Sequence, residues 1–112
     1  MKGSSGKCVD IRVGDFSETP YGRFDSDGKF NGKKFRESIL LPVLQDEKVE
    51  KVNVYLDTVE EGYEYGSSFF EEAFGGLVRV HRLKAKEVLE KLNIVTVHGD
   101  YVLEIKDYIS GA

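Results

Sequence analysis

Two adjacent serines, Ser67 and Ser68, stand where a loop gives way to a helix. The loop before them, residues 58–66, reads TVEEGYEYG and has no apolar period, whereas apolar residues recur at helical spacing after them. A helix N-terminus carries unpaired N–H groups and a partial positive charge, so it tolerates a phosphate well. Both serines are therefore candidate phosphoacceptors. Capping of the helix by either hydroxyl is the structural alternative.

The same stretch carries candidate contacts for a protein partner. Two tyrosines in the loop are expected to be exposed, and a glycine pair inside the helix costs about 1 kcal/mol per residue relative to alanine. Close packing against the sheet is one reason for such a pair, and a flat surface for a partner is another. The candidate partner-binding residues are Tyr63, Tyr65, Phe69, Glu72, Gly75, Gly76 and Arg79.

Acidic residues gather around the serine pair. Six of the 20 acidic residues lie in the stretch 57–72, namely Asp57, Glu60, Glu61, Glu64, Glu71 and Glu72. Such a local negative field predicts a partner with a basic face. An acid/base enzyme using Asp57 and the glutamates after it is the alternative, and it requires a deep pocket with a carboxylate of raised pKa.

The residue patterns of metal sites, phosphate-binding loops and activated serine nucleophiles are not found in the sequence. His81 and His98 have no second His or Cys at ligand spacing, so no metal site is expected. Asp25, Asp27 and Gly28 resemble part of a calcium loop, but the remaining ligand positions do not match, and a turn is expected instead. The glycine-rich phosphate loops and the GxSxG nucleophile elbow are absent from the sequence. We therefore expect a non-enzymatic domain without a cofactor.

Length and composition limit the classes of protein to which the chain can belong. The chain has 112 residues, 16 basic against 20 acidic side chains, 40% hydrophobic residues and one cysteine. This favours one small domain over residues 8–112 behind a loose, polar terminus at residues 1–7. The mild acidity argues against nucleic acid, and no apolar run approaches the roughly 20 residues of a membrane span. Cys8 is expected to be buried and unpaired, in a cytoplasmic protein.

Periodicity predicts the elements of the first half of the chain. Apolar alternation predicts a strand over 9–13, and the turn residues 25–28 predict a β-hairpin over 21–30. A helix is expected to start at Gly32 with Asn31 as its cap. Pro42 should kink or end that helix near Leu41 because proline lacks an N–H.

The second half alternates strands with helices. Residues 52–57 predict the central strand, and helices follow from residue 67 and over 84–92. A strand over 94–97 precedes a final helix capped by Asp100, although the alternation at 101–105 also permits a strand. The order predicts an α/β domain, with a mixed sheet, the N-terminal hairpin and about four helices packed on it. The connection from 52–57 to 94–97 has the length of a parallel crossover.

Three motifs resemble the STAS-like family of bacterial small domains, long labelled a domain of unknown function. They are Gly22-Arg23-Phe24, Asn31-Gly32-x-x-Phe35-Arg36 and Ser67-Ser68-Phe69-x-x-Glu72-Ala73-Phe74-Gly75. The resemblance covers nearly the whole chain. It implies the STAS fold, whose larger relatives include anti-sigma-factor antagonists that present a serine at a helix start to a histidine-kinase-like ATPase.

The resemblance implies a function in partner switching. Ser67 or Ser68 would be the residue whose phosphorylation breaks binding, although Gly66 and Phe69 flank the pair where antagonists usually have an acidic residue and a glycine. We expect a regulatory domain that binds such an ATPase, or another regulator, through residues 58–79. A structural or self-associating domain, for instance a homodimer without a phosphoswitch, is the alternative.

Overall fold

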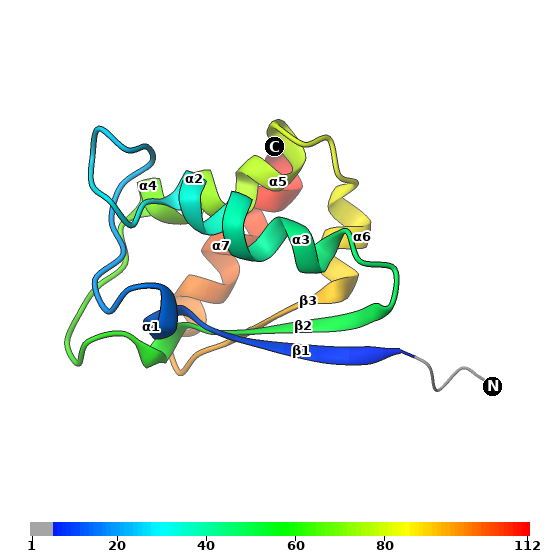
Figure 1. Cartoon of the computed structure of the whole chain (residues 1–112), viewed down its shortest axis with the longest axis horizontal. Helices are drawn as coiled ribbons and strands as arrows, with labels where there is room; N and C mark the ends of the chain where they lie inside the picture. Colours follow the sequence, from blue (N-terminus) through cyan, green and yellow to red (C-terminus); the bar gives the residue numbers. More distant parts are fainter. Residues whose placement is uncertain (1–5) are drawn as a thin grey trace.

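The longer helices lie on one side of a sheet of three parallel strands (Figure 1). The computed structural model describes residues 6–112. Strands β1 (Lys7–Arg12), β2 (Val49–Tyr55) and β3 (Leu92–Val95) lie in the order β1-β2-β3, and both pairings are parallel. The α/β class is confirmed. The strand predicted at 52–57 corresponds to β2, and its predicted central position is confirmed. The sheet of the described residues is wholly parallel rather than mixed.

Two long helices each consist of three consecutive segments. Helix 32–44 joins α2 (Gly32–Phe35), the π-helical turn η1 (Arg36–Leu40) and α3 (Leu41–Leu44). Helix 67–79 joins α4 (Ser67–Phe70), the π-helical turn η3 (Glu71–Gly75) and α5 (Gly76–Arg79). The shorter elements and the last helix are α1 (Val13–Phe16), the 3₁₀ turn η2 (Leu56–Thr58), α6 (Ala85–Lys91) and α7 (Gly99–Gly111).

The core lies between the sheet and the helices on its covered face. Val52 and Val54 of β2 are fully buried, as period-two alternation predicts, and they belong to the same core as Phe70 and Phe74 of helix 67–79. Burying a side chain of this size stabilises the fold by about 1.5–3 kcal/mol. Tyr65 stacks on Phe70 at a centroid distance of 4.9 Å, and burial raises the pKa of its phenol. The loop before helix 67–79 is thereby anchored to the core.

The other face of the sheet is polar. Asp10, Asn53 and Asn93 occupy one register across the three strands. Asn53 donates to Asp10 and Asn93 donates to Asn53, each at 3.0 Å. Parallel sheets are usually covered on both faces. Here a hydrogen-bonded row of polar side chains faces outward. Apolar and polar residues therefore alternate along each strand, and this alternation makes the strands predictable from the sequence.

Helix 32–44 begins as predicted but continues further. The Asn31 side chain accepts the Lys34 N–H at 2.9 Å, which confirms the predicted cap. The helix then runs past Pro42 to Leu44 instead of ending near Leu41. Pro42 cannot give the helical bond to Ser38, and the wider turn η1 directly before it accommodates that loss.

Residues 21–30 form a loop rather than the predicted β-hairpin. Tyr21 N–H does donate to the Phe30 carbonyl at 2.9 Å, but no strand follows on either side. The Asp27 carboxylate accepts the Arg23 N–H, which removes that donor from a ladder, and Gly22 has a positive φ of 79° that breaks the extended backbone. Local side-chain bonding therefore replaces strand pairing.

The structure corrects or completes the predictions made for the two ends of the domain. Residues 1–5 of the predicted loose terminus lie outside the described residues, and β1 already includes Lys7. Cys8 is exposed, not buried, because it lies on the outward face of the edge strand β1. Residues 99–111 are helical, which decides against the strand alternative. No helix within residues 6–112 is long and apolar enough to cross a membrane.

Candidate functional site

The serine pair opens helix 67–79 and is exposed to solvent. Gly66 occupies the N-cap position and no side chain caps the helix, so the predicted capping role of Ser67 or Ser68 is wrong. Both serines line a surface hollow of about 450 Å³ together with Tyr21 and Arg23. Both serines are therefore accessible from solvent in a hollow that a basic residue also lines.

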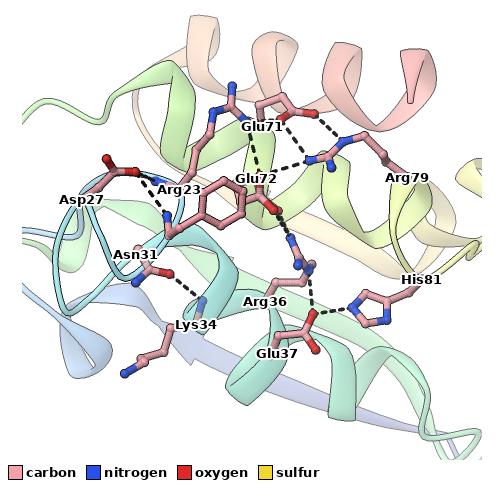
Figure 2. A network of polar contacts seen from close by, with 11 residues as sticks. Arg23, Asp27, Asn31, Lys34, Arg36, Glu37, Glu71, Glu72, Arg79 and His81 are labelled. Atoms are coloured by element: carbon pink, nitrogen blue, oxygen red, sulfur yellow. Dashed lines mark hydrogen bonds and ion pairs between the residues drawn. The ribbon is translucent and has the colours of Figure 1, made fainter.

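Behind the serines, three arginines surround two glutamates (Figure 2). Glu71 pairs with Arg23 and, at 3.1 Å, with Arg79. Glu72 pairs with Arg36 at 2.8 Å, with Arg79 at 3.2 Å and with Arg23 at 3.3 Å. We call these five residues the arginine cluster. It joins the 21–30 loop, helix 32–44 and helix 67–79.

The arginine cluster has a buried centre. The side chains of Arg36 and Glu72 are only 2% and 3% exposed, and Arg36 also donates to the Glu72 carbonyl. Two buried opposite charges in contact compensate each other, but removing one leaves the other unpaired at high cost. The two π-helical turns supply this pair, Arg36 from η1 and Glu72 from η3.

The glycine pair is explained by packing between helices. A Cβ on Gly76 would lie 2.2 Å from Arg36 Nη1, and one on Gly75 would lie 3.3 Å from the Tyr108 carbonyl of α7. Glycine at these positions admits the Arg36 guanidinium and the last helix. The glycine pair thus packs closely against helix 32–44 and α7, whereas the sequence analysis suggested close packing against the sheet.

A further carboxylate extends the arginine cluster on its outer side. Glu37 accepts from Arg36 Nε at 2.9 Å and contacts His81 Nε2. Burial by itself would raise the pKa of Glu37, but the hydrogen bonds with His81 and Arg36 outweigh it and hold the pKa below its ordinary value. Burial would likewise raise the pKa of Glu71, and its bonds with Arg23 and Arg79 lower it instead. Both carboxylates are therefore stabilised in their charged form.

The structure separates the predicted partner-binding residues into two groups. Four of them are buried, so they have no surface to offer a partner in this conformation: Phe69, Glu72, Gly75 and Gly76. Tyr65 was expected to be exposed, but it is 9% exposed and its hydroxyl donates to the Leu56 carbonyl. Tyr63 is half-buried, and Arg79 reaches the surface while it pairs with Glu71.

The glutamates of the 58–66 loop are exposed, and Asp57, just before the loop, has a structural role. Glu60, Glu61 and Glu64 are exposed to solvent. Asp57 accepts from the Thr96 hydroxyl at 2.6 Å and from the Val97 N–H at 2.8 Å. Both oxygens of Asp57 thus tie the β3–α7 turn to the end of β2, a role that needs no catalysis. Within residues 6–112, no three His, Cys, Asp or Glu side chains are grouped to share a metal ion.

Sequence reasoning missed Arg23 and Arg36 as members of a shared site. The signal for Arg36 was its place on the buried stripe of helix 32–44, beside Phe35 and four residues before Leu40. A charged residue there requires a buried partner of opposite sign. Glu72 stands on a buried stripe in the same way, four residues before Gly76.

The fold and the site define a small α/β domain with an exposed serine pair beside an acidic loop. A family model described as a STAS-like domain of unknown function (DUF4325) matches residues 31–101, from the Asn31 cap to the first turn of α7. The match covers more than half of the chain, and the chain therefore belongs to this family. STAS-like domains are generally non-enzymatic, and the family suggests a regulatory role. No curated protein and no solved structure matches the chain.

Proposed function

We propose that this domain is a non-enzymatic regulatory module that binds a protein partner through the 58–66 loop and the start of helix 67–79. The observation that carries the proposal is the exposure of Ser67 and Ser68 next to three exposed glutamates, with no capping bond holding either hydroxyl. Loops held on a rigid scaffold commonly carry binding residues. Here Tyr65 and the arginine cluster provide that scaffold.

The charge of this surface favours a partner with a basic face. Glu60, Glu61 and Glu64 face solvent, whereas the arginine cluster already compensates Glu71 and Glu72. The uncompensated negative charge is thus confined to the loop, whereas the sequence suggested that it extends into helix 67–79. Complementary charge across an interface speeds association and selects the partner. The family resemblance supports a histidine-kinase-like ATPase as that partner.

Phosphorylation is the proposed control. The serine Oγ would bond to the γ-phosphorus of ATP, with ADP as the leaving group and loss of the hydroxyl proton. The phosphate adds about −1.5 to −2 charge. Arg23 lines the same hollow and can approach a phosphate on either serine. Because Glu71 and Glu72 are already paired, the added charge acts on the partner more than on the helix.

A binding titration tests the surface. A purified histidine-kinase-like ATPase from the organism that produces this protein is titrated by calorimetry with the wild type and with the Glu60→Lys, Glu61→Lys, Glu64→Lys variant. A matched control reverses three exposed glutamates elsewhere: Glu47→Lys, Glu87→Lys and Glu90→Lys. We expect the loop variant to lose at least about tenfold in affinity while the control keeps it. Equal affinities for both variants would refute the assigned surface.

Intact-mass analysis tests the phosphoswitch separately. After incubation with the same ATPase and ATP, the wild type should gain the mass of one phosphate. The gain should disappear in the Ser67→Ala, Ser68→Ala double variant, and the single variants assign the acceptor. A mass gain that persists in the double variant, or none in the wild type, contradicts the phosphoswitch.

A further inference from the structure

Two adjoining hollows lie at the carboxyl ends of β2 and β3, where the 58–66 loop meets the start of α7. Figure 1 shows both segments at that end of the sheet. The first hollow has a volume of about 340 Å³ and the second of about 410 Å³. They share four lining residues, namely Gly62, Tyr63, His98 and Tyr101. Because the two hollows share these walls, they form one depression, which we call the tyrosine groove.

The walls of the tyrosine groove are mainly apolar and aromatic. Six residues of this kind line the first hollow: Leu56, Val59, Tyr63, Tyr65, Val97 and Tyr101. Val97 is 86% exposed, the largest fraction among the exposed large hydrophobic side chains within residues 6–112. The His98 ring lies 5.1 Å from the Tyr101 ring, centroid to centroid, and continues the aromatic surface into the second hollow. Grouped apolar surface that is open to solvent marks interaction sites.

Hydrogen bonds within the protein hold the two tyrosine rings of the groove in place. The Tyr63 hydroxyl donates to the Pro20 carbonyl, and the Tyr101 hydroxyl accepts the Tyr65 N–H at 3.3 Å. Both phenol groups are thus engaged before any ligand arrives. A site whose side chains are already ordered loses less conformational entropy when it binds. The rings therefore offer a prepared surface.

The charge around the tyrosine groove is negative. None of the residues that line the two hollows is a lysine or an arginine, and five are acidic: Asp57, Glu60, Glu61, Glu64 and Asp100. Asp57 accepts from the Thr96 hydroxyl and the Val97 N–H. None of the other four forms an ion pair with a basic side chain within residues 6–112. The groove thus combines aromatic walls with uncompensated carboxylates.

We propose that the tyrosine groove binds a basic side chain of the partner protein. Lysine and arginine carry a cationic group on an apolar stem. The stem can pack on the rings of Tyr63 and Tyr101, while the cation is attracted by the ring faces and by Glu60 and Glu61. An acidic side chain would meet only like charge in this groove.

This inference rests on the proposed function for the protein that supplies the basic side chain. It extends the partner surface beyond the 58–66 loop to residues 97–101, which belong to the β3–α7 turn and the first turn of α7. The groove itself can be probed on the isolated protein with a small cation. Its failure and a failure of the proposed function are therefore distinguishable.

A titration followed by NMR tests the groove without the ATPase. The ¹⁵N-labelled full chain is titrated at low salt with N-acetyl-lysine N-methylamide, and in parallel with the norleucine analogue, which lacks the ammonium group. We expect saturable shifts from the lysine probe in the amide signals of Gly62, Tyr63, His98 and Tyr101, and none from the norleucine probe. The hollow beside α6 is the internal control, because lysines as well as glutamates line it, and it should show no shifts.

Variants separate the contribution of the rings from that of the charges. Tyr101→Leu removes an aromatic face, and Glu60→Gln with Glu61→Gln removes two charges, so each should weaken binding of the lysine probe by about two- to fivefold. Tyr101→Phe loses the same hydroxyl as Tyr101→Leu but keeps the ring, and it should bind as the wild type does. Tyr55→Leu is a matched control, because Tyr55 lines neither hollow.

The outcomes distinguish the groove from the proposed function. The inference is overturned if the lysine probe causes no saturable shifts, if the norleucine probe causes equal ones, or if the shifts follow acidic residues over the whole surface. A Tyr101→Leu variant, or a Glu60→Gln, Glu61→Gln variant, that binds the lysine probe as tightly as the wild type overturns it too. Binding of the lysine probe as expected supports the groove even where the ATPase titration fails, and that failure then counts against the proposed function alone.

Discussion

Replacing Gly76 by alanine tests the packing of the arginine cluster. Gly76 has helical dihedrals, φ −61° and ψ −22°, so its backbone accepts alanine without strain. In an open helix the change would stabilise the protein by about 1 kcal/mol. Here the new Cβ would lie 2.2 Å from Arg36 Nη1 and 2.9 Å from its Cζ. The guanidinium must therefore move.

The cost follows from the bonds that Arg36 would give up. Its Nη1 donates to the Glu72 carboxylate and to the Glu72 carbonyl, and each charge-assisted bond contributes about 1.5–3 kcal/mol. Loss of both bonds, less the gain in helix propensity, predicts a decrease of about 2–5 kcal/mol in the free energy of unfolding. This is a large fraction of the roughly 5–15 kcal/mol typical of a domain.

Urea denaturation followed by circular dichroism measures this change. The matched control is Gly99→Ala, since nothing lies within 4 Å of a Cβ there, and it should stabilise the protein slightly or leave it unchanged. In the Gly76→Ala, Arg36→Met double variant the two costs should fall short of additivity by at least about 1 kcal/mol, because the clash has gone. A Gly76→Ala variant as stable as Gly99→Ala would refute the reasoning.

Three further predictions concern the same framework. Arg36→Met leaves Glu72 buried without its main partner and should cost about 3–5 kcal/mol in the free energy of unfolding, measured in urea. Tyr65→Phe removes the bond to the buried Leu56 carbonyl and should cost about 1–3 kcal/mol, whereas Tyr21→Phe at the exposed loop should change little. The pKa values of Glu37 and Glu71 lie below the ordinary value of 4.5, so their contribution to stability is present above that pH and is lost as the pH falls through the lowered pKa values. In thermal melts, the melting temperature should fall less with decreasing pH in Glu71→Gln than in the wild type. An equal fall of the melting temperature in the two proteins would contradict the role of Glu71.

Local patterns in the sequence were sufficient for most of the fold. The alternation at Val52 and Val54 predicts β2, and its central place follows from its flanking crossovers. Asn31 predicts the start of helix 32–44 because the capping bond is local. The 21–30 hairpin was wrong because the Asp27 carboxylate competes for a backbone N–H that a ladder would need.

The tertiary part of the site was not predictable from these patterns. Glu72 was expected among the partner-binding residues, and a glutamate is seldom buried, yet it lies in the interior, where Arg36 from another helix compensates its charge. The role of Gly76 depends on that same distant arginine. Contacts across 36 positions of chain have no local signature. The exposed serines, whose position depends only on a helix start, were placed correctly.

Hydrogen exchange on a mixture with the histidine-kinase-like ATPase used in the titration tests the proposed binding surface most directly. We predict slower exchange in the 58–66 loop and around Ser67 and Ser68, while the outward polar face of β1, β2 and β3 exchanges as it does in the free domain. Slower exchange confined to those strands, or to α6, would place the partner elsewhere and contradict the account.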